Sequence, residues 1–493
     1  GPISVIAPNN KIVSTWINIP NDEKEFASNK LKPYKTIIYQ AHENIVNNLI
    51  LGPHNTLGIR IPDHPFCKSL SEECKVPITT TSVNKSGELP KKNVGEILDS
   101  FQSSIDLIIE DGELSGSSSS IYFYQSKKMK RGFEMKIDTD FAMTINGQMV
   151  TTENTLPVYN PATRSVFAQV PDASKAQLDE TVSTARQAFN LWSKTSADER
   201  QAALETYADL IEENAEDIMS LLTREQGKPR AGAEWEVFGS AAWLRAVATQ
   251  RLPDEQIEDT DERRVVTRMT PVGVVGAIVP WNFPILLAIW KIAPALMAGC
   301  TIIVKPSPYT PLSDLKIVEL AQQVFPAGVL SAVSGGDELG KWMTVHSDIN
   351  KIAFTGSTEV GKLIERSLAG INKKTTLELG GKGANIIFED AAIDQAVEGI
   401  VNAIFFNQGH VCCAGSRLFI QESVADTVIE KLKDRISTLI IGDPLDKNTD
   451  IGAINSEEQL KTIEKYIKIG KKEGGEIYQT ECSLPKQGNW CPP

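Results

Sequence analysis

The sequence predicts an α/β protein built around an open, mostly parallel sheet. This prediction depends on three apolar runs, at residues 272–280, 301–305 and 351–356. Each run is short, continuous and rich in β-branched side chains, as expected of strands that are buried on both faces. Helical patterns separate the runs, and repeated strand–helix–strand units are typical of a doubly wound parallel sheet.

The helices between these strands are predicted from apolar spacing and from their end signals. Residues 203–229 form one amphipathic pattern that Gly227 and Pro229 close, so we expect a single helix there. Residues 290–300 follow the first apolar run, and residues 357–370 follow the third, each with helical spacing. These helices would cover the two faces of the sheet.

Bulk composition excludes several classes of protein. The chain has 493 residues, 41% of them hydrophobic, which is enough for about two to four domains. No apolar run is long enough to span a membrane, and the N-terminus lacks the pattern of a signal peptide. Seven cysteines without CxxC spacing indicate a reducing cytoplasm rather than a disulfide framework or zinc site. The net charge of −13 disfavours nucleic acid as a general partner.

The chain changes composition near residue 130. Residues 1–130 hold three alanines and one arginine against thirteen lysines, whereas the rest is rich in alanine and arginine. A solvated basic linker would explain the run KKMKRGFEMK, residues 127–136, but the wider shift indicates two unrelated sections joined together. We therefore predict one domain at 1–126, a junction at 127–134 and the larger section from Met135.

The front section shows a strand, a short helix and a second strand. Residues 56–66, TLGIRIPDHPF, read as a strand that ends at a proline-rich turn, SLSEEC (69–74) reads as a helix, and residues 76–88 read as a Thr-rich strand. Ser82 and Asn84 would point the same way in an extended chain, where their side chains could hold a phosphate or carboxylate. Ordinary turn chemistry explains the same residues.

Taken as a string, the front section resembles the YrdC-like family of threonylcarbamoyl-AMP synthases. GPISVIAP, TLGIRIPDHP, ITTTSVNKSGE, IDLIIEDGE and GSSSSIYF occur in the family's order. The resemblance implies an α/β fold with a nucleotide cleft, ATP as a substrate, tRNA only as an indirect partner, and nucleotide-binding roles for Arg60, Ser82 and Asn84. The family's opening strand and its Lys-x-Arg motif are absent, so we expect this fragment to be inactive.

In the larger section, polar residues follow the predicted strands. Asn282 follows the first apolar run, Lys305 ends the second, and Ser357 follows the third at the start of a helix. Ligands of open α/β sheets bind beyond the carboxyl ends of the strands, and a helix N-terminus attracts phosphate. Gly356 and Gly361 give a weak dinucleotide motif, because glycine turns between strand and helix are common without any ligand.

Residues 407–417, NQGHVCCAGSR, place two adjacent cysteines among small side chains. A buried thiol pair and half of a metal site are the ordinary explanations. A nucleophile that needs room for a substrate is the third, because a thiolate adds readily to a carbonyl carbon.

Five motifs together give a much stronger signal than any one of them. PWNFP, IIVKPS, FTGSTEVG, LELGGK and NQGHVCCAGSR occur in the order and spacing of the aldehyde dehydrogenase superfamily. This resemblance runs from about Met135 to Pro493. It implies a Rossmann-type NAD(P)-binding domain at 135–378 and a partial catalytic α/β domain at 379–493, behind the partial YrdC-like domain.

The resemblance implies an oxidoreductase that oxidises an aldehyde to a carboxylic acid through a cysteine thioester. Cys412 matches the nucleophile, Asn282 the oxyanion donor and Glu378 the base for the hydrolytic water. Leu377 and Leu379 flank Glu378, so we expect a half-buried carboxyl with a raised pKa. A surface carboxylate at a strand end is the alternative. His410 departs from the family's glutamine, and we expect a packed or solvated ring.

The resemblance also implies NAD or NADP as the cofactor, with NAD favoured. The cofactor-binding residues would be Trp281, Lys305, Gly356, Ser357 and Gly361. Many NAD-preferring members carry glutamate after KPS, where this chain has Pro308, so the choice between NAD and NADP stays open.

Residues 253–271 resemble the family's oligomerisation hairpin, which implies a homodimer or homotetramer in a complete protein. Family members continue beyond the equivalent of Pro493 with a Glu-x-Phe loop and the hairpin's partner strand. The sequence therefore leaves three hypotheses: an aldehyde dehydrogenase without a membrane partner, a threonylcarbamoyl-AMP synthase for tRNA modification, or a chimaera of truncated proteins with neither activity. The particular aldehyde is not predicted.

Overall fold

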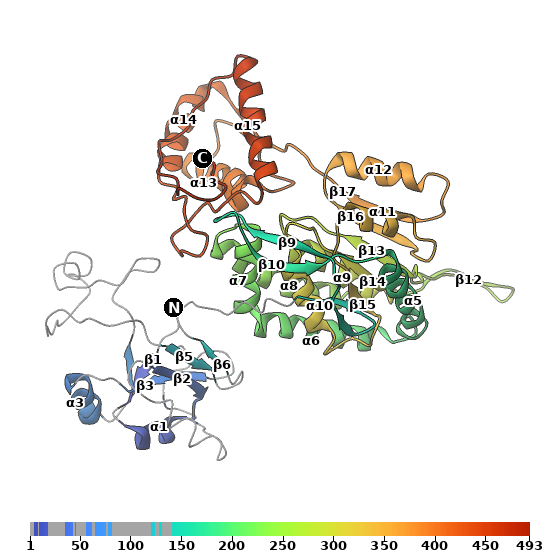
Figure 1. Ribbon diagram of the computed structural model, residues 1–493, viewed down its shortest axis with the longest axis horizontal. Coiled ribbons are helices and arrows are strands. Elements are labelled where there is room, and N and C mark those ends of the chain that lie inside the picture. Colours follow the sequence, from blue (N-terminus) through green and yellow to red (C-terminus); the bar gives the residue numbers. More distant parts are fainter. Residues whose placement is uncertain are drawn as a thin grey trace. The chain divides into compact units, whose positions relative to one another are not determined.

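The computed structural model divides the chain into two compact units, Gly1–Ile137 and Asp138–Pro493 (Figure 1). The residues that the structure describes are 4–7, 9, 10–17, 35–42, 45, 56–61, 65–74, 77–80, 120–123, 128–130 and 141–493. The boundary that the sequence places at residue 378, inside the second unit, stays a prediction.

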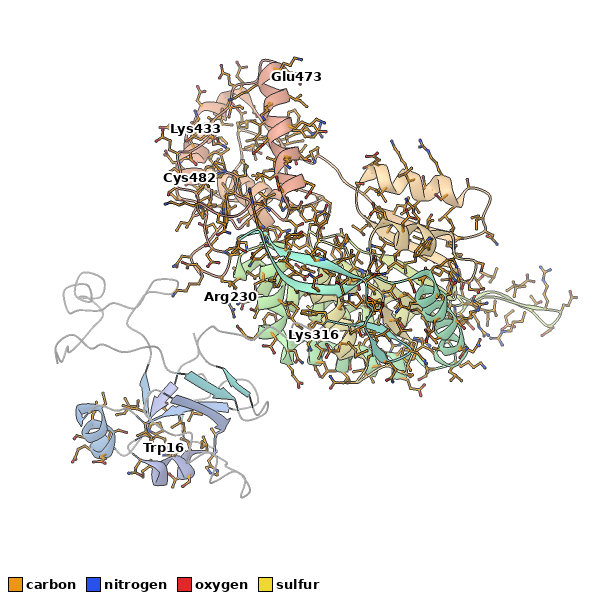
Figure 2. The ribbon with its side chains drawn as sticks, in the orientation of Figure 1. Trp16, Arg230, Lys316, Lys433, Glu473 and Cys482 are labelled. Carbon is orange, nitrogen blue, oxygen red and sulfur yellow. The ribbon has the colours of Figure 1, made fainter. Side chains whose placement is uncertain are left out.

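The first unit contains a mixed sheet with strand order β4-β1-β3-β2-β5-β6. Its strands are β1 (Ser4–Ile6), β2 (Lys35–Gln40), β3 (Thr56–Arg60), β4 (Ile78–Thr80), β5 (Ser120–Phe123) and β6 (Lys128–Lys130). Helix α1 (Asn10–Trp16) packs Val13 and Trp16 against Val5 of β1 and Ile59 of β3, and Figure 2 labels Trp16 there. Burial of these apolar side chains stabilises the sheet from one face.

The elements predicted for the front section are present. Strand β3 and helix α3 (Pro65–Cys74) lie where the sequence predicts a strand and a short helix, and β4 is the Thr-rich strand. Arg60 is the last residue of β3, whereas Ser82 and Asn84 lie outside the described residues. Residues 128–130, assigned to the junction from sequence, pair with β5 as strand β6.

The second unit is built on a seven-stranded sheet with order β17-β16-β13-β14-β15-β7-β8. Its strands are β7 (Met143–Ile145), β8 (Gln148–Val150), β13 (Val274–Ile278), β14 (Thr301–Lys305), β15 (Leu330–Ala332), β16 (Lys351–Thr355) and β17 (Lys374–Glu378). The five strands from β17 to β15 are parallel, which confirms the predicted doubly wound sheet. The core strands are buried on both faces, as apolar runs without alternation require.

An antiparallel hairpin, β7–β8, extends this sheet at the edge beside β15. Asn146 and Gly147 form its turn with φ angles of 51° and 73°. Two consecutive left-handed residues are what a tight primed turn requires, and Asn-Gly is the pair that adopts them most easily. The Asn-Gly dipeptide between two short strands is therefore a sequence signal for this hairpin, which was not among the predicted elements.

Eight helices of the second unit precede or surround the sheet. They are α5 (Lys175–Trp192), α6 (Ala197–Glu213), α7 (Ala215–Gln226), α8 (Arg230–Ala248), α9 (Pro284–Met297), α10 (Leu312–Ala321), α11 (Asp337–Val345) and α12 (Thr358–Leu368). Side chains of α5, α11 and α12 form one buried cluster with alternate residues of β13, β14 and β16. The remaining strand residues, such as Val275 and Ile302, are also buried, so the sheet has a packed face on each side.

The prediction of one helix over residues 203–229 is wrong in one respect. The segment forms two helices, α6 and α7, that meet at Asn214. The Asn214 amide donates to the Leu210 carbonyl at 2.8 Å, and this local bond competes with continuation of the helix. The predicted stop is confirmed, because Gly227 caps α7 with a φ of 93°.

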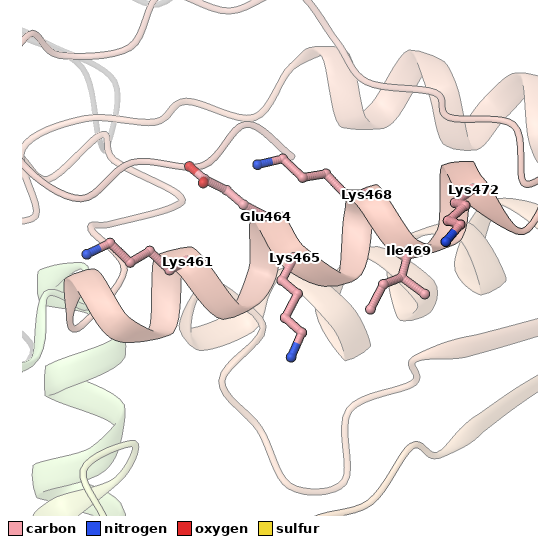
Figure 3. Close-up of a pocket in the computed structure, with 6 residues that line it drawn as sticks. All are labelled: Lys461, Glu464, Lys465, Lys468, Ile469 and Lys472. Atoms are coloured by element: carbon pink, nitrogen blue, oxygen red, sulfur yellow. The ribbon is translucent and has the colours of Figure 1, made fainter.

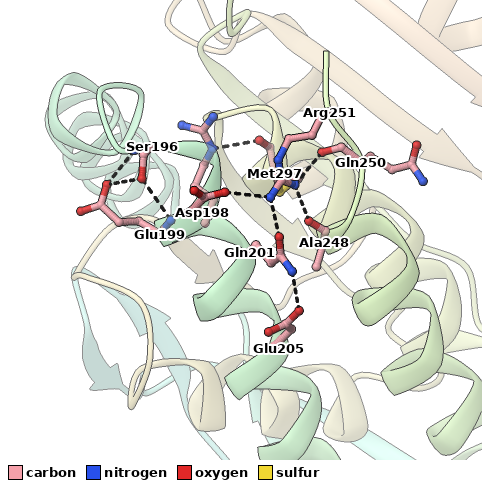
Figure 4. A network of polar contacts seen from close by, with 10 residues as sticks. Ser196, Asp198, Glu199, Gln201, Glu205, Ala248, Gln250, Arg251 and Met297 are labelled. Carbon is pink, nitrogen blue, oxygen red and sulfur yellow. Dashed lines mark hydrogen bonds and ion pairs between the residues drawn. The ribbon is translucent and has the colours of Figure 1, made fainter. Parts of the chain in front are cut away.

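A polar network joins the start of α6 to the ends of α8 and α9 (Figure 4). Ser196 and Glu199 form a capping box at the N-terminus of α6. Arg251, just beyond α8, donates to Asp198 at 2.9 Å and to the Ala248 carbonyl at 2.9 Å. Arg200 of α6 donates to the carbonyl of Met297, the last residue of α9, at 2.9 Å. These contacts hold the start of α6 against the ends of α8 and α9.

Strands β11 (Glu255–Asp259) and β12 (Arg264–Thr267) pair as an exposed antiparallel hairpin within residues 253–271. The final part of the unit contains β18 (Ala384–Ile387), η5 (Phe406–Gly409), β19 (Arg417–Ile420), and helices α13 (Ile393–Phe405), α14 (Glu422–Ser437) and α15 (Glu457–Lys472). Strands β18 and β19 are parallel, and their inward side chains pack on α13 and α14. Within the described part of the chain, no helix is both long and apolar enough to cross a membrane.

Candidate active site

Parallel pairing brings the predicted strand-end residues to one edge of the sheet. Ile278, the last residue of β13, pairs with Lys305 on one side and with Phe354 on the other. Thr355 at the end of β16 pairs in turn with Glu378 at the end of β17. The segments that follow β13, β14 and β16 therefore all leave the sheet at its carboxyl edge, where ligands of this architecture bind.

The segment before Cys412 has an unusual backbone. Asn407 and Gln408 have left-handed φ angles of 51° and 55°, followed by Gly409 at 76°. Such conformations are costly for residues with a Cβ atom, so the surroundings must hold them. The buried Asn407 amide donates to the Asn282 carbonyl at 2.9 Å, and the Gln408 amide donates to the Ala453 carbonyl at 2.9 Å. The two amides fix the approach to Cys412, which is exposed.

Asn282 lies beside this segment. Its side-chain nitrogen donates to the carbonyl of His410 at 2.9 Å, two residues before Cys412. Phe283, the next residue, packs in an apolar cluster with Phe406 and Val411 from the cysteine segment. The bond between Asn282 and His410 thus brings together two motifs that are more than a hundred residues apart in the sequence.

Glu378 is exposed, which corrects the expectation of a half-buried carboxyl. Leu377 and Leu379 both point inward and pack on the core cluster of the sheet. Because successive side chains of a strand point to opposite faces, two inward leucines place the residue between them outward.

The glycines after Glu378 lie against the cysteine segment. A Cβ atom at Gly381 would lie 3.3 Å from the Cys412 carbonyl oxygen, and one at Gly383 would lie 2.8 Å from the Ala414 carbonyl oxygen. Only glycine permits backbones to approach this closely. The glycine-rich segment therefore holds the end of β17, and with it Glu378, next to the loop that carries Cys412.

The predicted cofactor residues occupy the same edge. Lys305 is 4% exposed, and its ammonium group donates to the neighbouring Pro306 carbonyl at 3.3 Å. Burial lowers the pKa of Lys305 to about 8, although the negative charges of Asp337 and Asp172 partly oppose this shift. Ser357 caps α12 by accepting a bond from the Val360 amide at 3.2 Å. The positive N-terminus of α12 suits the phosphate groups of a dinucleotide. The buried amine of Lys305, which has only one hydrogen bond to the described chain, suits its hydroxyl groups.

The two glycines of the weak dinucleotide motif have packing roles. A Cβ atom at Gly356 would lie 2.4 Å from the Phe354 ring, and one at Gly361 would lie 2.5 Å from Leu379. Gly361 therefore lets α12 lie close to the strand that ends in Glu378. Trp281 contacts His410 edge-on, with ring centroids 4.8 Å apart.

The environment of the cysteine pair opposes ionisation. Partial burial, together with the adjacent Cys413 thiol, raises the pKa of Cys412 above its usual range. The thiolate is the nucleophilic form of cysteine. Cys412 therefore needs a base, or the positive charge of a bound ligand, to react at neutral pH.

His410 is buried, at 8% exposure, and its ring nitrogens make no hydrogen bond within the described chain. The packed ring confirms one of the two states expected from sequence. Burial, followed by the charge of Lys228, lowers the pKa of His410 to about 3. The neutral ring therefore persists through the physiological pH range.

This burial predicts acid sensitivity. The unfolded chain protonates His410 below pH about 6.5, whereas the folded protein does not until pH about 3. The unfolded state then binds more protons in that window, so the free energy of unfolding decreases as pH falls from 6.5 toward 3. Between pH 8 and pH 5, we expect the free energy of unfolding of His410→Gln to fall by about 2 kcal/mol less than that of the wild type.

Urea denaturation of both proteins at pH 5 and pH 8 measures the effect. His346→Gln is the control, because His346 lies in the same unit as His410. An equal pH dependence in the wild type and in His410→Gln would contradict the prediction.

Lys291 and Thr355 also lie at this edge of the sheet, although the sequence motifs did not indicate either residue. Lys291 Nζ donates to Thr355 Oγ1 at 2.5 Å, and burial lowers the pKa of Lys291 to about 8 while the charge of Glu378 opposes the shift. Lys291 is the single charged residue in α9, PILLAIWKIAPALM, and this was an available sequence signal. A lone lysine in an otherwise apolar helix lacks an obvious structural reason.

A separate hollow of about 450 Å³ lies on α15 (Figure 3). It is lined by Lys461, Glu464, Lys465, Lys468, Ile469 and Lys472. All six residues belong to one helix, and none is among the residues predicted for the site.

The doubly wound sheet, with polar residues gathered at its carboxyl edge, defines a dinucleotide-binding class of α/β protein. Residues 149–493 match the family model described as the aldehyde dehydrogenase family. The chain belongs to the aldehyde dehydrogenase family, which confirms the resemblance inferred from its motifs. Residues 1–131 match the model described as telomere recombination, which includes the YrdC-like proteins.

Solved structures agree with this assignment. An aldehyde dehydrogenase from Bacillus cereus in complex with NAD+ is 37% identical, with a TM-score of 0.70, over 72% of this chain and 74% of that one. PnpE from Pseudomonas sp. WBC-3 in complex with nicotinamide adenine dinucleotide is 37% identical, with a TM-score of 0.70, over 72% and 75%. An NADP-dependent enzyme of E. coli is 35% identical, with a TM-score of 0.66, over 68% and 71%.

Proposed function

We propose that the second unit oxidises an aldehyde to a carboxylic acid through a thioester on Cys412. The observation that carries this proposal is the pairing of an exposed cysteine with a side-chain amide. Asn282 donates to the backbone two residues before Cys412, so a second amide hydrogen remains to meet an oxyanion formed beside the sulfur. Membership of the aldehyde dehydrogenase family supports the reaction class.

The chemical tasks are then divided among Cys412, Asn282 and Glu378. The Cys412 thiolate adds to the carbonyl carbon, and its backbone N–H together with the Asn282 amide stabilises the resulting oxyanion. Exposed Glu378 accepts a proton from the water that cleaves the acyl group. Because the pKa of Cys412 is raised, we assign its deprotonation to Glu378 as well.

The cofactor is a nicotinamide dinucleotide. Lys305 would bind its ribose hydroxyls, Ser357 and the N-terminus of α12 its pyrophosphate, and Trp281 would border its pocket. When bound, the nicotinamide ring accepts the hydride that leaves the substrate carbon. Solved relatives with NAD and an NADP-dependent relative support either form, and we favour NAD.

The test is a direct assay of the full chain. Aliphatic and aromatic aldehydes are supplied with NAD+ or NADP+, and the absorbance of the reduced nicotinamide is followed. Aldehyde-dependent reduction with formation of the acid supports the proposal. No reduction with any aldehyde, although the chain is folded by circular dichroism, would refute it for this chain.

Two further proposals concern the setting of the protein. All seven cysteines are free, which supports a reducing cytoplasm. The exposed β11–β12 hairpin supports association of copies into a dimer or tetramer, because unpaired strand edges favour pairing. Sedimentation velocity of the purified chain measures that association.

As the alternative function, we propose that the first unit, if it is active, has a YrdC-like nucleotide site with ATP as its substrate and tRNA as an indirect partner. The family match over residues 1–131 and the position of Arg60 at the end of β3 support it. Pyrophosphate release that needs ATP, threonine and bicarbonate together would establish this activity. Its absence, with aldehyde oxidation present, would leave the second unit as the enzyme.

A further inference from the structure

A buried ion pair lies directly behind the candidate active site. Lys228 Nζ and a Glu236 carboxylate oxygen are 2.5 Å apart, and both side chains are 0% exposed. Removing two charges from water is costly, and apolar residues of similar size often stabilise a core better. Such a pair therefore calls for a reason other than stability, and its other partners supply one.

The two charges hold the segment that contains Asn282. Lys228 Nζ also donates to the Asn282 carbonyl at 2.8 Å and lies 4.3 Å from the centre of the Phe283 ring. The second oxygen of Glu236 accepts a bond from the Leu286 amide at 3.2 Å. The pair thus contacts this segment on both sides of Phe283.

Glu236 performs a capping task that the segment cannot perform for itself. Helix α9 begins at Pro284, and its N-cap residue, Phe283, has no side-chain acceptor. The carboxylate of Glu236 satisfies a free amide of the first turn from outside and places a negative charge at the positive end of the helix. The start of α9 is therefore held from α8, and Asn282 lies two residues before that start.

A continuous set of bonds leads from the ion pair to the cysteine loop. Lys228 holds the Asn282 carbonyl, and the Asn282 side chain donates to the His410 carbonyl at 2.9 Å. A shift of the Asn282 backbone would move the amide away from the sulfur of Cys412. We infer that Lys228 and Glu236 are a positioning pair that holds the Asn282 amide at the oxyanion site, an inference that rests on the proposed function.

Two reactions of the same thiol separate this role from general stability. With 4-nitrophenyl acetate, the thiolate attacks the carbonyl carbon, the oxygen takes up the electron pair, and collapse expels 4-nitrophenolate and leaves an acetyl thioester. With iodoacetamide, the sulfur displaces iodide at a saturated carbon, and no oxyanion forms. A residue that positions an oxyanion donor affects the first reaction and spares the second.

The experiment compares both rates in Lys228→Met/Glu236→Gln, which removes both charges and leaves neither one unpaired. We expect acylation to slow about tenfold or more, because small misplacements of a catalytic group are costly. Alkylation is expected to change less than about twofold. Should the double variant fail to fold, Glu236→Gln alone serves, with acylation expected to slow about threefold.

Glu225→Gln is the matched control. Glu225 is another buried carboxylate that caps a helix, accepting bonds from the Leu312 and Ser313 amides of α10 at 2.7 and 2.9 Å. It has no bond to the Asn282 segment among those of the described chain. For Glu225→Gln we expect a lower melting temperature, while the ratio of the acylation rate to the alkylation rate stays the same as in the wild type.

The outcomes are distinct. Unchanged acylation, or an equal fall in both reactions, overturns the inference. A second test adds Lys228→Met/Glu236→Gln to Asn282→Ala. Without the Asn282 amide, loss of the ion pair should slow acylation by less than about a further twofold. If the two losses in rate multiply instead, the inference is overturned. If Cys412→Ala retains the 4-nitrophenolate burst, the proposed function itself fails.

Discussion

Replacement of Cys412 by alanine is expected to abolish aldehyde oxidation, with a fall of at least about 10³-fold in turnover. The sulfur of Cys412 forms the bond to the substrate carbon, and alanine at this position cannot form an acyl intermediate. Turnover is measured from the reduced nicotinamide. Intact mass of the protein after a single turnover reports the acyl group.

Cys413→Ala is the matched control, since Cys413 is an exposed thiol on the adjacent residue. Loss of Cys413 also removes one cause of the raised pKa of Cys412. We therefore expect oxidation to persist, with the pH profile of alkylation by iodoacetamide shifted toward lower pH. Undiminished turnover by Cys412→Ala would refute the assignment of the nucleophile.

The second large effect is expected for Glu378→Gln, in the hydrolysis of the acyl-enzyme. The amide cannot accept the proton of the attacking water, so deacylation should slow by about 10²- to 10⁴-fold. The first turnover should be affected less, provided that the thiol is deprotonated before mixing at high pH. A burst of reduced nicotinamide equal to the number of sites, followed by a slow phase, is the expected trace.

Glu389→Gln provides the comparison for this experiment. Glu389 is an exposed carboxylate that accepts a bond from the Ser423 hydroxyl at 2.9 Å, and the proposed chemistry does not involve it. It should show steady turnover without a slow second phase. If Glu378→Gln shows the same steady turnover, another group activates the water.

The exposure of Glu378 bears on this role. Its carboxylate lies on the exposed side of the end of β17, where water can reach it. The negative charge of Glu378 favours the charged form of the Lys291 amine, so the two side chains attract each other at the same edge of the sheet. Water and a positive charge are therefore both available to Glu378 at this edge of the sheet.

The sequence by itself determined the class of fold and the chemistry of the loop. Continuous β-branched runs specify strands that need cover on both faces, and β13, β14 and β16 formed where those runs lie. The adjacent cysteines among small residues, together with four more motifs, predicted the family that residues 149–493 match. These signals are local, because they depend on backbone preference and on the chemistry of neighbouring side chains.

Tertiary structure alone decided what surrounds each site residue. The pairing of Thr355 with Glu378 and the bond from Asn282 to His410 join segments that are distant in the sequence. No local preference specifies the partner of Lys228. In the sequence, Lys228 looks like any lysine that follows a helix-ending glycine. Its burial against Glu236 results from packing of α8 and α9 at the sheet edge, and long-range packing determines which buried charges meet.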